Sequence, residues 1–94
     1  MTPEKVQGNL GIYRDCLERM GVQAERMNPE RTFKSMSEAE LLRHALHLVE
    51  SVEKLVAENA ALDKIGRHYA FLQACLSFAG WYTLEELMSQ NRSD

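Results

Sequence analysis

The chain has 94 residues, of which 45% are hydrophobic and 27% are charged, and its formal net charge is −3. A chain of this length forms one domain with a single core, and its composition excludes wholesale disorder. Residues 1–36 carry six Lys or Arg against five Asp or Glu, residues 37–94 carry five against nine, and no basic run occurs. Binding to a nucleic-acid backbone is therefore disfavoured as the main activity.

The cysteines and the apolar runs bear on the cellular compartment. Cys16 and Cys75 are too few and too scattered for a disulfide framework. The amino-terminal residues lack the regions of a signal peptide, and the longest apolar run is too short to span a membrane. We expect a cytoplasmic protein with no membrane contact.

The first predicted element is a helix over about 3–20. Thr2 is a favourable N-cap, and Pro3 suits the first helical position. Gly21 is typical of the residue that follows a helix. Apolar residues recur at steps of four and three on one face of this helix: Val6, Leu10, Tyr13, Leu17 and Met20. Residues 22–36, which contain the Asn28-Pro29 turn signal, form a linker within the single domain 1–94.

Ser37 and Glu40 form a capping box at the start of the strongest helical pattern. A one-sided stripe follows at steps of four and three, and its members are Leu41, Ala45, Leu48, Val52, Leu55, Asn59, Leu62, Ile65, Tyr69, Leu72 and Leu76. The phase shifts near Gly66, so either one helix over about 38–79 is kinked there or two helices meet. The absence of a Pro or Asn-Gly turn favours one continuous helix.

A continuous helix over 38–79 would be about 60 Å long, which a single small globule cannot cover. We therefore expect a partner helix from a second chain, in a homodimeric coiled coil. Asn59 falls at a core position of the heptad pattern, where a buried Asn can fix the register. The alternative is that Asn59 lies at the helix surface and has no such role.

Residues 70–79 are almost entirely apolar, which predicts a helix buried on more than one side. Gly80 ends it, and Thr83 with Glu86 forms a second capping box before a short helix over about 84–91. The residues around this bend form a predicted C-terminal clasp, consisting of Phe78, Gly80, Trp81, Tyr82, Thr83 and Glu86. We expect its aromatic side chains to pack in the fold and not to contact a ligand.

Metal and cofactor sites are not predicted. Glu40, His44 and His47 share one helix face at i, i+4 and i+7, which is a workable spacing for metal ligands. No fourth ligand is placed by the sequence, so a solvated face is the better interpretation. We expect neither a metal nor a cofactor.

An enzyme is not predicted either. Cys16 or Cys75 with His68 would supply a nucleophile and a base, but no Gly-rich loop accompanies them. Cys75 also lies in the most apolar stretch, which favours a buried, inert thiol.

A DNA-binding helix-turn-helix would use residues 67–79 and 83–91. Its second helix carries Glu85 and Glu86 at its amino end, and Arg92 is the one base beside it. A recognition helix presents cations and amides to DNA, so nucleic-acid binding is disfavoured.

Residues 67–92 resemble the carboxy-terminal signature of small phage and prophage proteins. That signature joins an Arg-led apolar helix to a Gly turn and a Thr-Ile/Leu-Asp/Glu-Glu helix that ends in Asn-Arg. The matching residues are Arg67, His68, Phe71, Gln73, Leu76, Gly80, Thr83, Leu84, Glu85, Glu86, Asn91 and Arg92. The departures are Ala70 and Ala74, where the family favours Gly, and Ser77 and Phe78, near the place of its Trp. The resemblance covers about a quarter of the chain and implies a viral or mobile-element setting, with no implied reaction.

These observations favour a small non-enzymatic protein that binds a host or viral protein. It would then be an inhibitor or modulator of a defence or regulatory system, acting in the host cytoplasm. The alternatives are a transcriptional regulator or other DNA-associated factor, and a minor structural or assembly protein of the phage particle.

Overall fold

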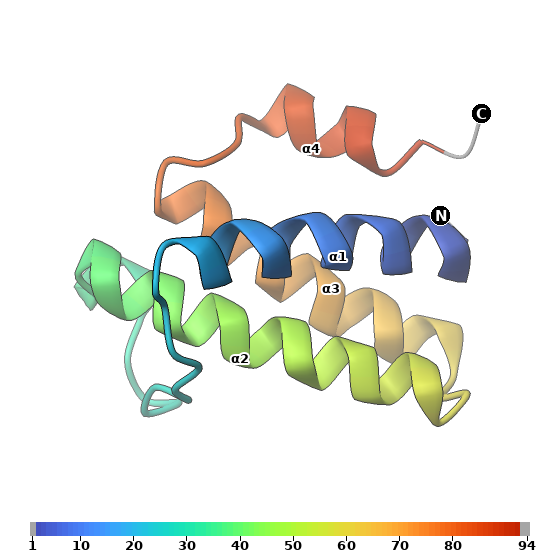
Figure 1. Cartoon of the computed structure of the whole chain (residues 1–94), viewed down its shortest axis with the longest axis horizontal. Helices are drawn as coiled ribbons and strands as arrows, with labels where there is room; N and C mark the ends of the chain where they lie inside the picture. Colours follow the sequence, from blue (N-terminus) through green and yellow to red (C-terminus); the bar gives the residue numbers. More distant parts are fainter. Residues whose placement is uncertain (1, 93–94) are drawn as a thin grey trace.

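The computed structural model describes residues 2–92, and within them all regular secondary structure is helical, with no strand (Figure 1). The elements are α1 (Pro3–Arg19), the 3₁₀ helix η1 (Phe33–Ser35), α2 (Glu38–Ala57), α3 (Leu62–Phe78) and α4 (Leu84–Gln90). The predicted all-α class, the amino-terminal helix, the long second helix and the short carboxy-terminal helix are confirmed. No helix in the described part of the chain is both long and apolar enough to cross a membrane.

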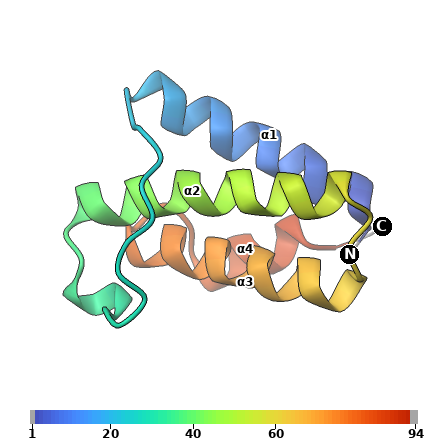
Figure 2. The same cartoon turned by 90° about the horizontal axis from the view of Figure 1, so that it is seen from below.

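The chain runs back and forth, so that α2 packs against both α1 and α3 (Figures 1 and 2). Four residues of the predicted apolar face of α1 lie in the core, since Val6, Leu10, Tyr13 and Leu17 are each at most 1% exposed. The fifth, Met20, follows the helix and is 58% exposed. Residues of the long stripe supply the rest of the centre, and the buried ones are Leu41, Ala45, Leu48, Val52, Ile65, Tyr69, Leu72 and Leu76. Leu55 is partly buried, and Asn59 and Leu62 are exposed, so most of the stripe packs within one chain but its middle does not.

The expected continuity of the helix over 38–79 is wrong, because the chain breaks between α2 and α3 at residues 58–61. Asn59 adopts a left-handed backbone conformation with φ 55°. The Ala60 N–H donates to the Leu55 carbonyl at 3.0 Å, and the Asn59 N–H donates to the Val56 carbonyl at 3.1 Å. This is the Schellman arrangement that ends a helix, and Asn is the residue that most often replaces Gly in it. Gly66 lies inside α3 and marks no break.

Two other helices end in the same way, at the glycines that the sequence identified. Gly21 follows α1 with φ 77°, and Gly80 follows α3 with φ 84°. In both cases the next residue returns a hydrogen bond to the last helical turn, from Val22 to Leu17 and from Trp81 to Leu76. Thus α1, α2 and α3 each end at a residue with the left-handed φ that a Schellman end requires.

Because of the break at Asn59, the stripe of α2 does not need a partner helix from a second chain. Because α3 folds back along α2, it covers the stripe of α2 within the same chain (Figure 2). The radius of gyration is 12.6 Å, close to the value of about 12 Å for a compact domain of this size. Asn59 is exposed, so it occupies no buried register position. The stripe no longer provides a reason for a dimer, and homodimerisation stays a prediction.

Residues 22–36 cross over one end of α2 in a mostly extended conformation (Figure 2). Two backbone contacts hold this segment to α2: the Glu25 N–H donates to the Arg43 carbonyl at 3.1 Å, and the Met27 N–H donates to His44 Nδ1 at 3.2 Å. Met27 is 8% exposed and anchors the segment through its side chain. The segment therefore forms a wall beside α2 and α3.

Candidate binding groove

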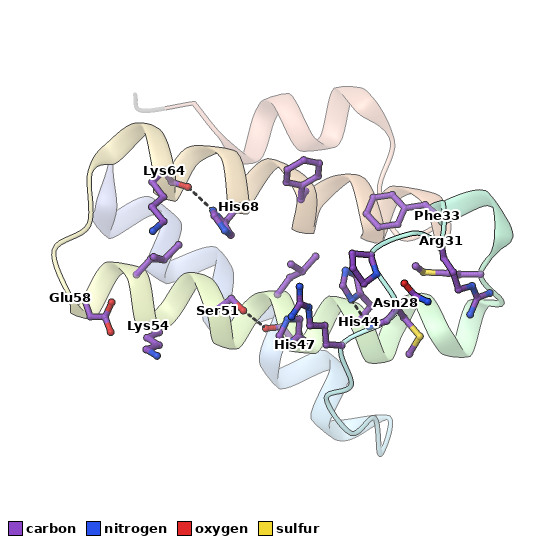
Figure 3. A pocket seen from close by; sticks show the side chains of 17 residues that line it. Asn28, Arg31, Phe33, His44, His47, Ser51, Lys54, Glu58, Lys64 and His68 are labelled. Carbon is purple, nitrogen blue, oxygen red and sulfur yellow. Dashed lines mark hydrogen bonds between the residues drawn. The ribbon is translucent and has the colours of Figure 1, made fainter.

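A groove of about 910 Å³ lies between that wall, one face of α2 and the first half of α3 (Figure 3). Its wall is formed by residues from Arg26 to Met36, including Met27, Pro29 and Phe33. The face of α2 contributes His44, His47, Leu48, Ser51, Lys54, Leu55 and Glu58, and α3 contributes Lys64, His68 and Phe71. We refer to this set of residues as the groove.

The ion pair of Arg31 with Glu40 holds the wall to the start of α2. Two guanidinium nitrogens of Arg31 donate to the two carboxylate oxygens of Glu40, at 2.5 and 3.1 Å. Glu40 Oε1 also accepts the Ser37 N–H at 3.0 Å and so completes the predicted capping box. Arg31 lowers the pKa of Glu40 to about 2 by this hydrogen bonding, and the Ser37 amide adds to the effect. The Glu40 carboxylate is therefore engaged at neutral pH.

His44 supports the wall in its neutral form. Its Nδ1 accepts the Met27 N–H, and its ring lies 6.2 Å from that of Phe33 and 5.6 Å from that of His47. Burial lowers the pKa of His44, and the neighbouring His47 and Arg26 lower it further. An Nδ1 that accepts a hydrogen bond cannot carry a proton, so the contact requires a neutral His44 ring whose proton is on Nε2.

The candidate metal ligands are not assembled into a site. Glu40 pairs with Arg31, and His44 Nδ1 faces a backbone amide. Across residues 2–92 no group of three His, Cys, Asp or Glu side chains has the geometry to hold a metal ion.

The groove is basic although the chain is acidic. Four Lys or Arg side chains line it against the single carboxylate of Glu58, whereas the whole chain carries 11 against 14. Among the described residues, no ion pair engages Arg26, Lys54 or Lys64. Figure 3 places Lys54 and Lys64 with Glu58 near one end of the groove and Arg31 near the other. Arg26, Lys54 and Lys64 therefore form a rim that is available to an anionic group, whereas Arg31 is held by Glu40.

The floor of the groove is apolar. Leu48 is buried at its base, and Leu55 lies partly buried along the same face of α2. Phe71 stands on the opposite side with 60% of its surface exposed. The groove thus combines an apolar floor and an exposed aromatic ring with cations that form no ion pair, a combination that interfaces between proteins also show.

The candidate nucleophile and base do not meet. Cys75 is fully buried, its thiol donates to the Leu41 carbonyl at 3.1 Å, and burial raises its pKa to about 12. His68 lies two helical turns away, about 10 Å along α3, and its Nδ1 is 2.9 Å from the Lys64 carbonyl. The thiol is thus held in its unreactive protonated form.

A buried polar network on the other side of α3 positions α4. Its members, which are joined by side-chain hydrogen bonds, are Asn9, Tyr13, Tyr69, Gln73, Gln90 and Asn91. Gln73 is its most buried amide and exchanges two hydrogen bonds with Asn91, at 3.0 and 2.9 Å. Burial raises the pKa values of Tyr13 and Tyr69, which keeps both phenols protonated and able to donate. The network ties α4 to α1 and α3.

The residues of the predicted clasp lie where α3 ends and α4 begins. Thr83 and Glu86 form the expected capping box of α4, and Trp81 packs partly buried beside Tyr82, at a ring distance of 6.3 Å. Phe78 is 58% exposed, and its ring lies 5.6 Å from that of Phe33 in the wall. The clasp therefore holds helix ends together and lies outside the groove.

The sequence did not identify the groove, because its wall has no periodic pattern and reaches α3 only through the fold. One signal was present: His44, His47, Ser51, Lys54 and Glu58 recur at three- and four-residue steps beside the apolar stripe. Comparisons with protein-family models, with curated proteins and with solved structures find no match to this chain.

Proposed function

We propose that this protein is a non-enzymatic binding protein of phage or prophage type, which holds a host or viral protein in the groove and thereby modulates it. The observation that supports the proposal most strongly is that the exposed Phe71 side chain lines the same groove as Lys54 and Lys64, which form no ion pair with a described residue. Aromatic anchors surrounded by polar groups account for most of the binding energy at protein interfaces.

The scaffold around the groove also suits a binding protein. The floor belongs to α2 and α3, whose inner faces form the core, and two hydrogen-bonded contacts and an ion pair fix the wall. A preformed surface of this kind loses little conformational entropy when a partner binds. The groups with potential chemistry, Cys75 and Glu40, are each occupied by structural contacts.

A DNA-associated role is the second candidate, and the basic rim is the observation that favours it. We place it second because a floor of Leu48, Leu55 and Phe71 suits apolar side chains.

Affinity capture with matched variants tests this proposal. Phe71→Ser removes an exposed ring from the groove, and Ile12→Ser removes a side chain of similar exposure, 57%, from α1 outside it. We expect wild type and Ile12→Ser to retain the same protein from lysate of phage-bearing cells, and Phe71→Ser to retain about tenfold less. Equal capture by all three proteins, or capture that nuclease treatment abolishes, would contradict the proposal.

A further inference from the structure

We infer that the segment bound in the groove is an acidic amphipathic helix of the partner protein. This inference rests on the proposed function, because it names the chemistry of the partner at the same site. Two independent properties of the groove support it: the sign of its charge and the form of its floor.

The charge of the groove selects an acidic partner. Lys54 on α2 and Lys64 on α3 lie at one end, and Arg26 belongs to the wall; no described residue forms an ion pair with any of the three. Carboxylates arriving at this rim gain attraction, whereas cations meet repulsion. A groove lined by three such cations and by the single carboxylate of Glu58 is therefore complementary to a carboxylate-rich segment.

The length of the groove and the lack of a sheet edge in the described residues favour a helical bound segment. The part of α2 that lines it runs from His44 to Glu58, about 21 Å along the axis, which equals four turns of a bound helix. The described residues contain no strand, so they offer no sheet edge to which an extended peptide could add. Apolar side chains on one face of a helix would meet Leu48, Leu55 and Phe71, while its flanking carboxylates face the rim.

Binding of defined probes tests the inference. The first probe is a fluorescein-labelled 14-residue peptide of about four turns, with Leu along one face and Glu flanking it. The second replaces each Glu by Lys, and the third is a 14-base-pair DNA duplex. Fluorescence anisotropy at 50 and 200 mM salt should show the Glu peptide binding at least about tenfold tighter than the Lys peptide, with affinity that falls at higher salt.

Charge reversal locates the binding. Lys54→Glu combined with Lys64→Glu should weaken binding of the Glu peptide about tenfold and remove most of its salt dependence. The control, Lys5→Glu combined with Arg92→Glu, makes the same change in net charge outside the groove and should leave affinity within about twofold. Phe71→Ser should weaken the Glu peptide at both salt concentrations. Thermal melting of each variant confirms that it is folded.

The outcomes separate the inference from the proposed function. If the Lys peptide binds as well as the Glu peptide, or neither binds, the acidic-helix inference is overturned. The proposed function still stands in that case, provided that capture from lysate depends on Phe71. If the duplex binds most tightly and competes at the groove, both are overturned in favour of the DNA-associated role.

Discussion

At the scale of single residues, Asn59 has the largest effect on the architecture. Its φ of 55° lets α2 end and α3 return along it. The sequence placed this residue at a core position because its spacing from Leu55 and Leu62 fits the apolar stripe. Periodicity reports which face a residue occupies only while the helix continues, so it could not reveal a residue that ends the helix.

The effect of a substitution at Asn59 on the free energy of unfolding should depend on whether the new residue adopts positive φ, and not on its helix propensity. Asn59→Gly should leave the free energy of unfolding within about 0.5 kcal/mol, because Gly adopts positive φ freely. Asn59→Ala should lower it by about 1 kcal/mol, because a Cβ opposes the left-handed conformation. Urea denaturation followed by circular dichroism measures both. A more stable Ala variant would indicate a continuous helix and contradict the break.

His44 makes the wall of the groove sensitive to pH. Its folded pKa is depressed below 6.5, so at falling pH the unfolded chain takes up the proton first. Stability should therefore decline as pH falls below about 6.5, and the decline should cease below the folded pKa. Denaturant titrations between pH 7.5 and 5 should show this slope in wild type. A His44→Gln variant should show a shallower one, and equal slopes would refute the assignment.

The two thiols should differ in reactivity. Burial raises the pKa of Cys75 to about 12, whereas Cys16 is only partly buried. Native protein treated with Ellman's reagent at pH 8 should release about one equivalent of product rapidly, from Cys16, and a second only on unfolding. Cys16→Ser should abolish the rapid phase. Rapid reaction of that variant would show that Cys75 is accessible.

At the scale of elements, α4 is held mainly by polar contacts. Leu87 is its one buried side chain, and the network around Gln73 joins its end to α1 and α3. The sequence predicted this helix and its capping box from local residues alone. It could not predict the network, because Asn9 lies 81 residues from Gln90 and Gln73 lies 18 residues from Asn91, and each pair meets only in the folded chain.

Removal of Asn91 should loosen α4. Asn91→Ala leaves the buried Gln73 amide without two of its hydrogen bonds, at a cost of about 1–3 kcal/mol in the free energy of unfolding. Amide hydrogen exchange in residues 84–90 should accelerate more than exchange in α2. Ser89→Ala, an exposed change in the same helix, is the control. Unchanged exchange after Asn91→Ala would show that the hydrogen bonds between Asn91 and Gln73 do not hold α4.

At the scale of the whole molecule, the chain covers its own apolar stripe and leaves one basic, partly apolar groove. Helix types, caps and core faces followed from local pattern, because each depends on neighbours within a few residues. The groove depends on the path of residues 22–36 over α2 and on the return of α3, which no local pattern determines. The stripe predicted a dimer because its local pattern does not show that α3 of the same chain packs against α2.

Light scattering at micromolar concentration tests whether the protein forms a homodimer. The predicted homodimer would have twice the mass of one chain, which is 10.8 kDa, and the mass of a single chain would contradict that prediction. Exposed apolar residues such as Leu84 and Met88 remain on α4, and a doubled mass would direct attention to them as a dimer surface.

The most direct test of partner binding at the groove is site-specific photocrosslinking in the cells that make the protein. Photoreactive p-benzoylphenylalanine replaces Phe71 in the groove or, as the control, Ile12 on α1; both side chains are exposed, so the fold tolerates the change. We expect a discrete protein adduct from position 71 that is absent from position 12. Equal adducts from both positions, or an adduct from position 12 alone, would contradict it.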